Sequence, residues 1–343
     1  MDDRKKRILQ AITDDYINTA EPVGSRTIAR RYNLGISPAT IRNEMADLEE
    51  SGYLEQPHTS AGRIPSQKGY RFYVDFIMKV EGVSAEEKRR IRRELDERRR
   101  EISLLIEETA RILAQLSRYA AFVLPPVSRA GVFKRLELVP VDDQTVLVVL
   151  VIDPGFVKTH LVATGHRLTQ RQLAHIAGFL NSRLRNLSLA GIGSGLLREI
   201  RAELDEYNSF LDAALDAIVR SLETRPEDQV YTNGQVNILE QPEFRDVTKA
   251  KAVLELLAED EAVYSLLADT VNAQNVKVVI GQESAVPGMS ACSMVSAPYE
   301  VCGVPVGALG VLGPTRMHYS HVVALVEIVA ENLSDVLTRM LVV

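Results

Sequence analysis

The sequence predicts a multidomain α+β protein that begins with a winged helix-turn-helix domain. Residues 1–71 carry three helical patterns followed by a glycine-tipped hairpin. Beyond residue 124, hairpin-forming strands are mixed with amphipathic helices, which favours an α+β fold over a doubly wound parallel sheet. A chain of 343 residues is long enough for two or three such domains.

The first two helices are predicted from the spacing of apolar residues. Five of these fall on one face of an amphipathic helix: Ile8, Leu9, Ile12, Tyr16 and Ile17. A second, short helix is expected from Ser25 to Tyr32, and the turn Asn33-Leu34-Gly35 joins it to a third.

The third helix is predicted from its start and stop signals. Ser37 can cap it, Pro38 suits its first position, and Gly52 ends it. Its apolar residues recur at helical spacing as one buried stripe: Ile41, Met45 and Leu48.

The start of this third helix carries residue types that contact bases. In a winged helix-turn-helix, these residues lie in the major groove. Arg42 can pair with two guanine acceptors, Asn43 can bridge adenine, and Ala39 or the Thr40 methyl can touch a thymine methyl. The acidic residues of the helix, which phosphate would repel, come later. We predict DNA contacts from Ser37, Pro38, Ala39, Thr40, Arg42 and Asn43.

A two-stranded wing is expected from Tyr53 to about Pro65. Gly62 would let the backbone approach phosphate closely, and Arg63 would reach toward a minor groove. Residues 56–71 contain three cations and no acid. A solvated surface position explains any one of these cations equally well, but as a group they favour DNA. The predicted contacts here are His58, Thr59, Ser60, Gly62, Arg63, Lys68 and Arg71.

The charge distribution fits a local DNA-binding surface. The chain has 40 basic and 46 acidic residues, a net charge of −6, which argues against a general polycation. From Arg4 to Arg71 we count 11 basic and 8 acidic residues, so this segment is +3 and the remainder is −9. An acidic remainder would suppress indiscriminate DNA binding.

A long charged connecting helix is expected after Ser84, which can form a capping box with Glu87. Its apolar positions approach a 4-3 alternation that breaks at Arg98 and Thr109, so a domain-joining helix is favoured over a coiled coil. Its arginines are interleaved with acids, and we interpret them as a solvated face, with contact to flanking DNA as the alternative.

The remaining elements follow from periodicity and turn residues. Strands are expected at 132–139, 145–152, 156–163, near 230, and at 276–280, 291–297 and 304–312. Helices are expected at 169–184, 196–203, 206–222, 247–258 with a short one following, and 319–341. Residues 146–152 are seven apolar residues without charge or proline, typical of a fully buried central strand that aggregates when exposed.

The chain has no recognisable catalytic, phosphate-binding or metal-binding motif. It lacks GxxxxGK[ST], GxSxG and HExxH, so we expect neither an enzyme nor a bound cofactor. Cys292 and Cys302 have no metal-ligand spacing and are expected to be small buried residues. His318 and His321 are expected at the surface. No signal peptide or membrane span is indicated, and the expected location is the cytoplasm.

Three residues are the first choices for lining a pocket in the C-terminal half: Glu283, Arg316 and Met317. A buried structural pair, or a contact at a helix start, is the favoured explanation for them.

Two long stretches resemble one protein family. SPATIRNEMADLEESGYLEQPHTSAGRIPSQKGYRFYVD is similar to the N-terminal signature of the heat-inducible transcription repressor HrcA family. VLGPTRMHY, with IGQE before it, resembles the same family's second signature. The similarity spans nearly the whole chain.

The resemblance implies a domain organisation and a function. The domains would be a winged-helix domain (1–82), a connecting helix (83–123), a GAF-like α+β domain (124–152 and 228–343) and an inserted α+β dimerisation domain (153–227). The function would be repression of class I heat-shock (chaperone) operons by a homodimer on an inverted-repeat operator in double-stranded DNA. Release would follow heat stress, and the chaperonin GroEL would maintain the active state.

The residues alone leave another regulator class open. A metabolite-responsive winged-helix regulator would hold a small effector in the GAF-like half. An enzyme with a DNA-binding appendage is disfavoured, because no nucleophile and base can be named from spacing. Apolar helical surfaces between 169 and 222 are the expected dimer contact, although they can equally form intradomain core.

Overall fold

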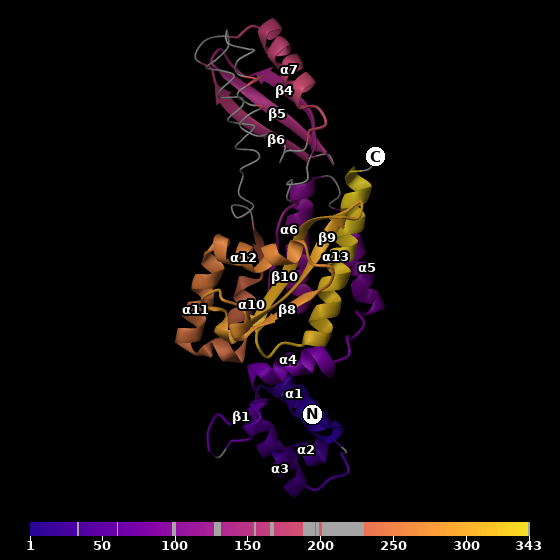
Figure 1. Cartoon of the computed structure of the whole chain (residues 1–343), viewed down its shortest axis with the longest axis vertical. Coiled ribbons are helices and arrows are strands. Elements are labelled where there is room, and N and C mark those ends of the chain that lie inside the picture. Colours follow the sequence, from indigo (N-terminus) through magenta and orange to yellow (C-terminus); the bar gives the residue numbers. More distant parts are fainter. Residues whose placement is uncertain are drawn as a thin grey trace. The chain divides into compact units, whose positions relative to one another are not determined.

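The computed structural model describes the chain except for residues 33, 60, 98–100, 127–131, 154–155, 165–167, 188–195, 197–198, 201–229 and 342–343. The chain divides into two compact units. One comprises Met1–Pro125 with Gln229–Leu337, and the other comprises Pro126–Asp228 with Thr338–Val343. The fold is mixed α+β, as the sequence predicts (Figure 1).

The N-terminal domain, residues 1–82, contains three helices, a short hairpin and a fourth helix. In order these are α1 (Asp3–Thr19), α2 (Ser25–Arg31), α3 (Pro38–Glu50), β1 (Leu54–Glu55), β2 (Ile64–Pro65) and α4 (Gln67–Phe76). The predicted apolar stripes meet in one core that includes Ile8, Ile12, Ile28, Ile41 and Leu48. Each of these residues is fully buried or nearly so.

The predicted ends of α3 are confirmed. The Ser37 hydroxyl accepts a hydrogen bond from the backbone N–H of Thr40 at 3.1 Å, and Pro38 occupies the first turn. Gly52 follows the helix with a left-handed φ of 77°, a conformation that glycine adopts without strain.

The prediction of a single connecting helix is wrong. The structure has two helices, α5 (Ala85–Glu97) and α6 (Ile102–Ser117), that contact one another in antiparallel order. Arg90 donates to Gln115 at 2.7 Å, and Arg111 donates to Glu94 at 2.9 Å. The break in the apolar spacing near Arg98 therefore separates two helices of a hairpin, which bury Ile91 and Leu95.

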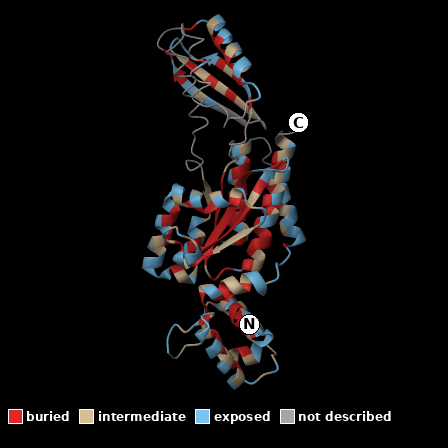
Figure 2. Ribbon diagram, in the orientation of Figure 1, coloured by how far each residue is buried: buried red, intermediate tan, exposed pale blue. Residues whose placement is uncertain are grey.

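A five-stranded antiparallel sheet forms the centre of the first unit, in the order β7-β3-β10-β9-β8. The strands are β3 (Ala120–Val123), β7 (Tyr231–Asn233), β8 (Lys277–Ile280), β9 (Cys292–Val301) and β10 (Val304–Pro314). Buried residues concentrate on β9 and β10 (Figure 2). The helices and turns around the sheet are α10 (Gln235–Leu239), η5 (Pro242–Arg245), α11 (Val247–Ala258), α12 (Asp260–Val271), η6 (Gly281–Glu283), η7 (Met289–Ala291) and α13 (Tyr319–Leu341).

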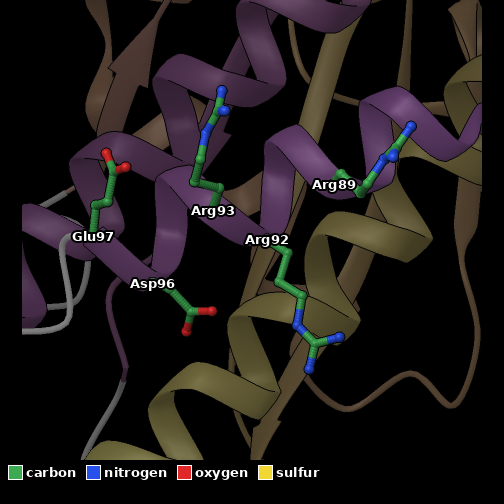
Figure 3. A pocket seen from close by; sticks show the side chains of 5 residues that line it. All are labelled: Arg89, Arg92, Arg93, Asp96 and Glu97. Atoms are coloured by element: carbon green, nitrogen blue, oxygen red, sulfur yellow. The ribbon is translucent and has the colours of Figure 1, made fainter.

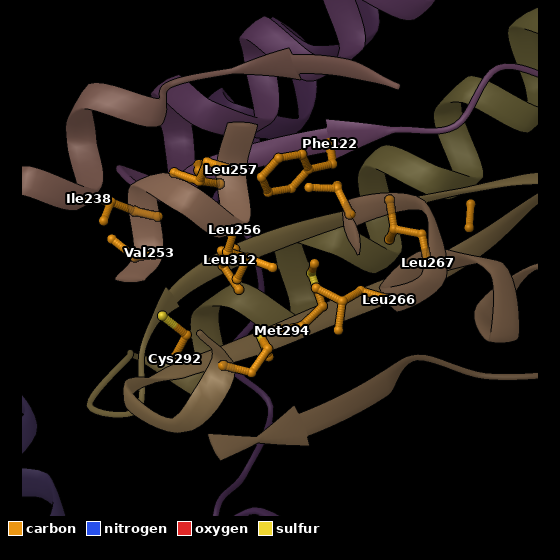
Figure 4. Close-up of a cluster of buried hydrophobic side chains, with 14 of the residues drawn as sticks. Phe122, Ile238, Val253, Leu256, Leu257, Leu266, Leu267, Cys292, Met294 and Leu312 are labelled. Carbon is orange, nitrogen blue, oxygen red and sulfur yellow. The ribbon is translucent and has the colours of Figure 1, made fainter. Parts of the chain in front are cut away.

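Helices cover both faces of this sheet. Side chains alternate along β9, so Ser296 bonds Thr270 of α12 at 2.8 Å, whereas Ser293 bonds Tyr319 of α13 at 2.7 Å. The face toward α11 and α12 is a cluster of apolar side chains (Figure 4), among them Phe122, Leu256, Leu267, Met294 and Leu312.

The expected assignment of 124–152 to the domain of 228–343 is wrong. β4 (Val132–Pro140), β5 (Thr145–Asp153) and β6 (Phe156–Ala163) form a separate antiparallel sheet in the order β4-β5-β6. Helix α7 (Gln170–Leu184) packs against β4, and its core includes Val148, Leu150 and Leu180. The insertion therefore begins at about Pro126, because among the described strands β5 pairs with β4 and β6 in a separate sheet.

The apolar run in β5 is central but buried on one face. Val146, Val148 and Leu150 are buried, whereas Leu147, Val149 and Val151 are partly exposed. The expected full burial is therefore wrong for the residues described. The helices expected at 196–203 and 206–222 fall largely outside the described residues.

The two cysteines differ. Cys292 is buried, and burial raises the pKa of its thiol to about 12. Cys302 is exposed at the turn between β9 and β10, where its φ is 53°, so the expectation that it is buried is wrong. In the described part of the chain, no helix has the length and apolarity needed to cross a membrane.

Candidate nucleic-acid interface

One side of α3 is buried and its first turn is exposed. The buried stripe Ile41, Met45 and Leu48 faces the core formed with α1 and α2. The predicted base-contacting residues are brought together at the other side. Thr40 is partly exposed, and the remaining members are exposed: Ser37, Pro38, Ala39, Arg42 and Asn43.

Three of the four acidic residues of α3, Glu44, Asp47 and Glu49, form ion pairs with cations of the same domain. Glu44 lies 3.4 Å from Arg4 and 3.8 Å from Lys5, and Asp47 lies 2.9 Å from Lys5. The hydrogen bond that Lys5 donates to Asp47 raises the pKa of Lys5. Because Arg4 and Lys5 offset the charge of these carboxylates, the negative charge of α3 is reduced where phosphate would approach.

The β1–β2 hairpin, which is the predicted wing, is fixed to α3 by the Arg63 side chain. Its Nε lies 2.8 Å and its Nη2 2.7 Å from Oε2 of Glu49. The Arg63 backbone forms an antiparallel bridge with Val23, with N···O distances of 2.9 and 2.8 Å. The sequence predicts that Arg63 reaches toward DNA; in the structure without DNA, its side chain is paired with Glu49.

Gly62 is explained by the same bridge. A Cβ at this position would lie 2.4 Å from the carbonyl carbon and oxygen of Val23. Close packing against the protein's own backbone, rather than against phosphate, therefore requires glycine here.

The wing tip presents His58 and Thr59 to solvent. Gln56 shapes the tip, because its Nε2 donates to the carbonyls of Thr59 and Ala61 at 3.0 and 3.1 Å. The predicted contact Ser60 lies outside the described residues.

Lys68 and Arg71 are engaged elsewhere in the fold. The Lys68 ammonium donates to the carbonyl of Ser51 at 2.9 Å and lies 4.4 Å from the centre of the Tyr53 ring. Arg71 lies 2.8 Å from Asp75 and 3.2 Å from Glu283. Arg71 is therefore held by carboxylates of α4 and η6.

Two exposed arginines of α2 were missed by the sequence reasoning. Arg26 and Arg30 have no ion pair among the residues that the structure describes, and their helix packs against α3. Helix α2 carries three arginines and no acid in seven residues, a signal that was available in the sequence. The third, Arg31, is paired with Asp15.

The arginines of α5 agree with the expected solvated face. Arg89, Arg92 and Arg93 line an open hollow of about 470 Å³ together with Asp96 and Glu97 (Figure 3). The lining thus carries both signs of charge.

The three residues that were the first choices for lining a pocket in the C-terminal half make structural contacts. Arg316 is buried and paired with Glu243 at 2.6 Å, which confirms the expected buried pair. Met317 is fully buried, and Glu283 accepts from the backbone N–H of Ile280 at 2.8 Å.

The chain is similar to known repressors over nearly its full length. Residues 103–323 match the family model described as HrcA protein C terminal domain. The heat-inducible transcription repressor HrcA of Pelotomaculum thermopropionicum is 47% identical over 339 residues, covering 99% of this chain and 97% of that protein. The heat-inducible transcription repressor HrcA of Desulforudis audaxviator is 47% identical over 341 residues, covering 99% of each.

A solved structure shares the fold. The crystal structure of a hypothetical protein at 2.2 Å resolution superposes with a TM-score of 0.62. The two chains are 23% identical, and the match covers 99% of each.

The close approach at Gly62 gives a stability prediction. Gly62→Ala is expected to lower the free energy of unfolding by about 1–3 kcal/mol, because the Val23 backbone must shift. Gly82→Ala is the matched control, since no atom lies within 4 Å of the added Cβ. Denaturant unfolding of both full-length variants checks this, and equal stabilities would contradict the role given to the Val23–Arg63 bridge.

Proposed function

Because the chain belongs to the HrcA family of heat-inducible transcription repressors, we propose that it represses by placing α3 in the major groove of an inverted-repeat operator. The protein is a transcription repressor rather than an enzyme. In this proposal the N-terminal domain is a winged helix-turn-helix. The observation that carries it is the exposed first turn of α3. Three carboxylates later in the helix, Glu44, Asp47 and Glu49, are paired with Arg4, Lys5 and Arg63.

Each exposed residue has a role set by its chemistry. Arg42 would donate to the O6 and N7 of a guanine, and Asn43 would bond the N6 and N7 of an adenine. Ala39 and the Thr40 methyl would touch thymine methyl groups, because the Thr40 hydroxyl lies 2.9 Å from that of Ser37. Ser37 and Pro38 begin α3, and their backbone would come close to the edges of the bases.

Phosphate contacts would come from both sides of α3. Arg26 and Arg30 of α2 would bind phosphates, since the preceding helix of this motif crosses the DNA backbone. His58, Thr59 and Lys68 would contact the backbone from the wing side. Arg63 and Gly62 would act indirectly by holding the wing in place.

The active species would be a homodimer. One recognition helix spans few base pairs, and a two-fold dimer matches an inverted repeat with half-sites set by its own geometry. Linkage of two sites then raises affinity. Residues 126–228 would form the inserted dimerisation domain, and the five-stranded sheet with its helices would form the GAF-like domain.

Base-specific contact by Arg42 has a direct test. The operator is first selected by the wild-type protein from a random-sequence duplex library. Arg42→Ala is expected to weaken binding to it by about 1–3 kcal/mol and to lose preference at one base pair per half-site. Arg92→Ala, on α5, is the control and should bind like wild type. An equal loss on all sequences would make Arg42 a phosphate contact.

Heat release would depend on partial unfolding. Heat would expose apolar strands such as β5 and withdraw active dimer, and the chaperonin GroEL would restore it. On stepwise warming, operator binding is expected to fall before or together with the onset of light scattering, and chaperonin with ATP should recover it. A protein that stays folded and bound throughout the heat-shock range would contradict this.

A further inference from the structure

The N-terminal domain contacts the C-terminal half through α4, within one compact unit. Gln67 donates to the carbonyl of Ser290 at 3.0 Å and accepts from the backbone N–H of Gln282 at 2.9 Å. Arg71 donates to the carbonyl of Val278 at 2.9 Å. These polar contacts are partly open to solvent, so each contributes little on its own.

Arg316 makes the buried polar contact between the same two parts. It lies between β10 and α13, and its side chain is 10% exposed. Nε and Nη2 donate to the two carboxylate oxygens of Glu243 at 2.6 and 3.4 Å, and Nη1 donates to the carbonyl of Ile17 in α1. One planar guanidinium therefore joins a carboxylate of the C-terminal half to the backbone of the N-terminal domain.

The end of α1 needs a donor at this point. Ile17 lies in the last turn, where helix carbonyls lack partners within the helix. That turn has no basic residue of its own, and Ile17 is 5% exposed, so water has little access to it. Arg316 supplies both the donor and the positive charge that a helix C-terminus favours.

Buried tyrosines lie near this contact, and Tyr70 interacts electrostatically with Arg316. Tyr70 of α4 and Tyr319 of α13 are buried, with ring centroids 6.0 Å apart. The Tyr70 hydroxyl has no hydrogen-bond partner in the described part of the chain. In so apolar a setting, the hydrogen bonds of Arg316 are strong and their loss leaves groups that water cannot reach.

We propose that Arg316 is a positioning residue for DNA recognition. It fixes the direction in which α1, and with it α3, leaves the C-terminal half, so that a dimer holds its two recognition helices at a set separation. This inference rests on the proposed function. A residue that only stabilised the fold would change the amount of active protein, whereas a positioning residue changes which half-site spacing is bound.

The spacing of half-sites provides the test. The probes are the inverted repeat selected by the wild-type protein, the same repeat with one base pair added to its spacer, and a single half-site. Arg316→Met is expected to weaken binding to the selected repeat about tenfold or more. It should leave single half-site binding unchanged and discriminate less than wild type against the lengthened spacer.

Amide hydrogen exchange without DNA gives a second readout. In Arg316→Met, exchange is expected to rise in the last turn of α1 and in α4 while α3 and β9 keep wild-type protection. Arg245→Met, an exposed arginine near Glu243, is the control and should match wild type in both assays. Glu243→Gln should change spacing discrimination and amide exchange in the same direction as Arg316→Met. This second variant keeps the test decisive if Arg316→Met fails to fold.

The outcomes are distinct. Unchanged spacing discrimination with unchanged exchange would overturn the role of Arg316 and leave the proposed function standing. Equal losses on the repeat, the lengthened repeat and the half-site would also overturn it, because they indicate less folded protein. A wild-type protein that selects no inverted repeat would overturn the proposed function itself.

Discussion

Burial of Ile41, Met45 and Leu48 fixes the rotation of α3, and the surface that we propose contacts DNA follows from that constraint. With this stripe in the core, helical geometry places Arg42 and Asn43 on the exposed side. Because Ser37 caps the helix, the first turn stays ordered, and its residues are short or carry a planar polar group suited to base edges. A different rotation of α3 would bury these groups and expose the apolar stripe.

The cations of the N-terminal domain divide into two classes. Lys5, Arg63 and Arg71 are held by carboxylates and shape the domain or its junction, whereas Arg26, Arg30 and Arg42 are exposed with no ion pair among the described residues. Net charge alone does not separate these classes. Lys5 and Arg63 also pair with acids of α3, which lowers the negative charge of that helix.

Signals from neighbouring residues made some helix ends and turns predictable from the sequence. The cap at Ser37, the turn at Gly52 and the limits of α11 and α13 depend on neighbouring residues, and the sequence sufficed for them. Contacts between distant segments were not predictable. The partner of Arg63 is Glu49, the reason for Gly62 is the Val23 backbone, and β5 pairs with β4 and β6 in their own sheet. Strand patterns indicate a strand but not its sheet, and the uniformly apolar run in β5 did not show that only one of its faces is buried. The α5–α6 hairpin was missed because helical periodicity does not show where a chain turns back.

Methylation interference on the selected repeat tests the central claim most directly, because methylation of guanine N7 blocks major-groove contact alone. Interference is expected at guanines placed symmetrically in the two half-sites, on the face of the duplex where two α3 helices would dock. Strong binding that no major-groove methylation impairs would contradict it.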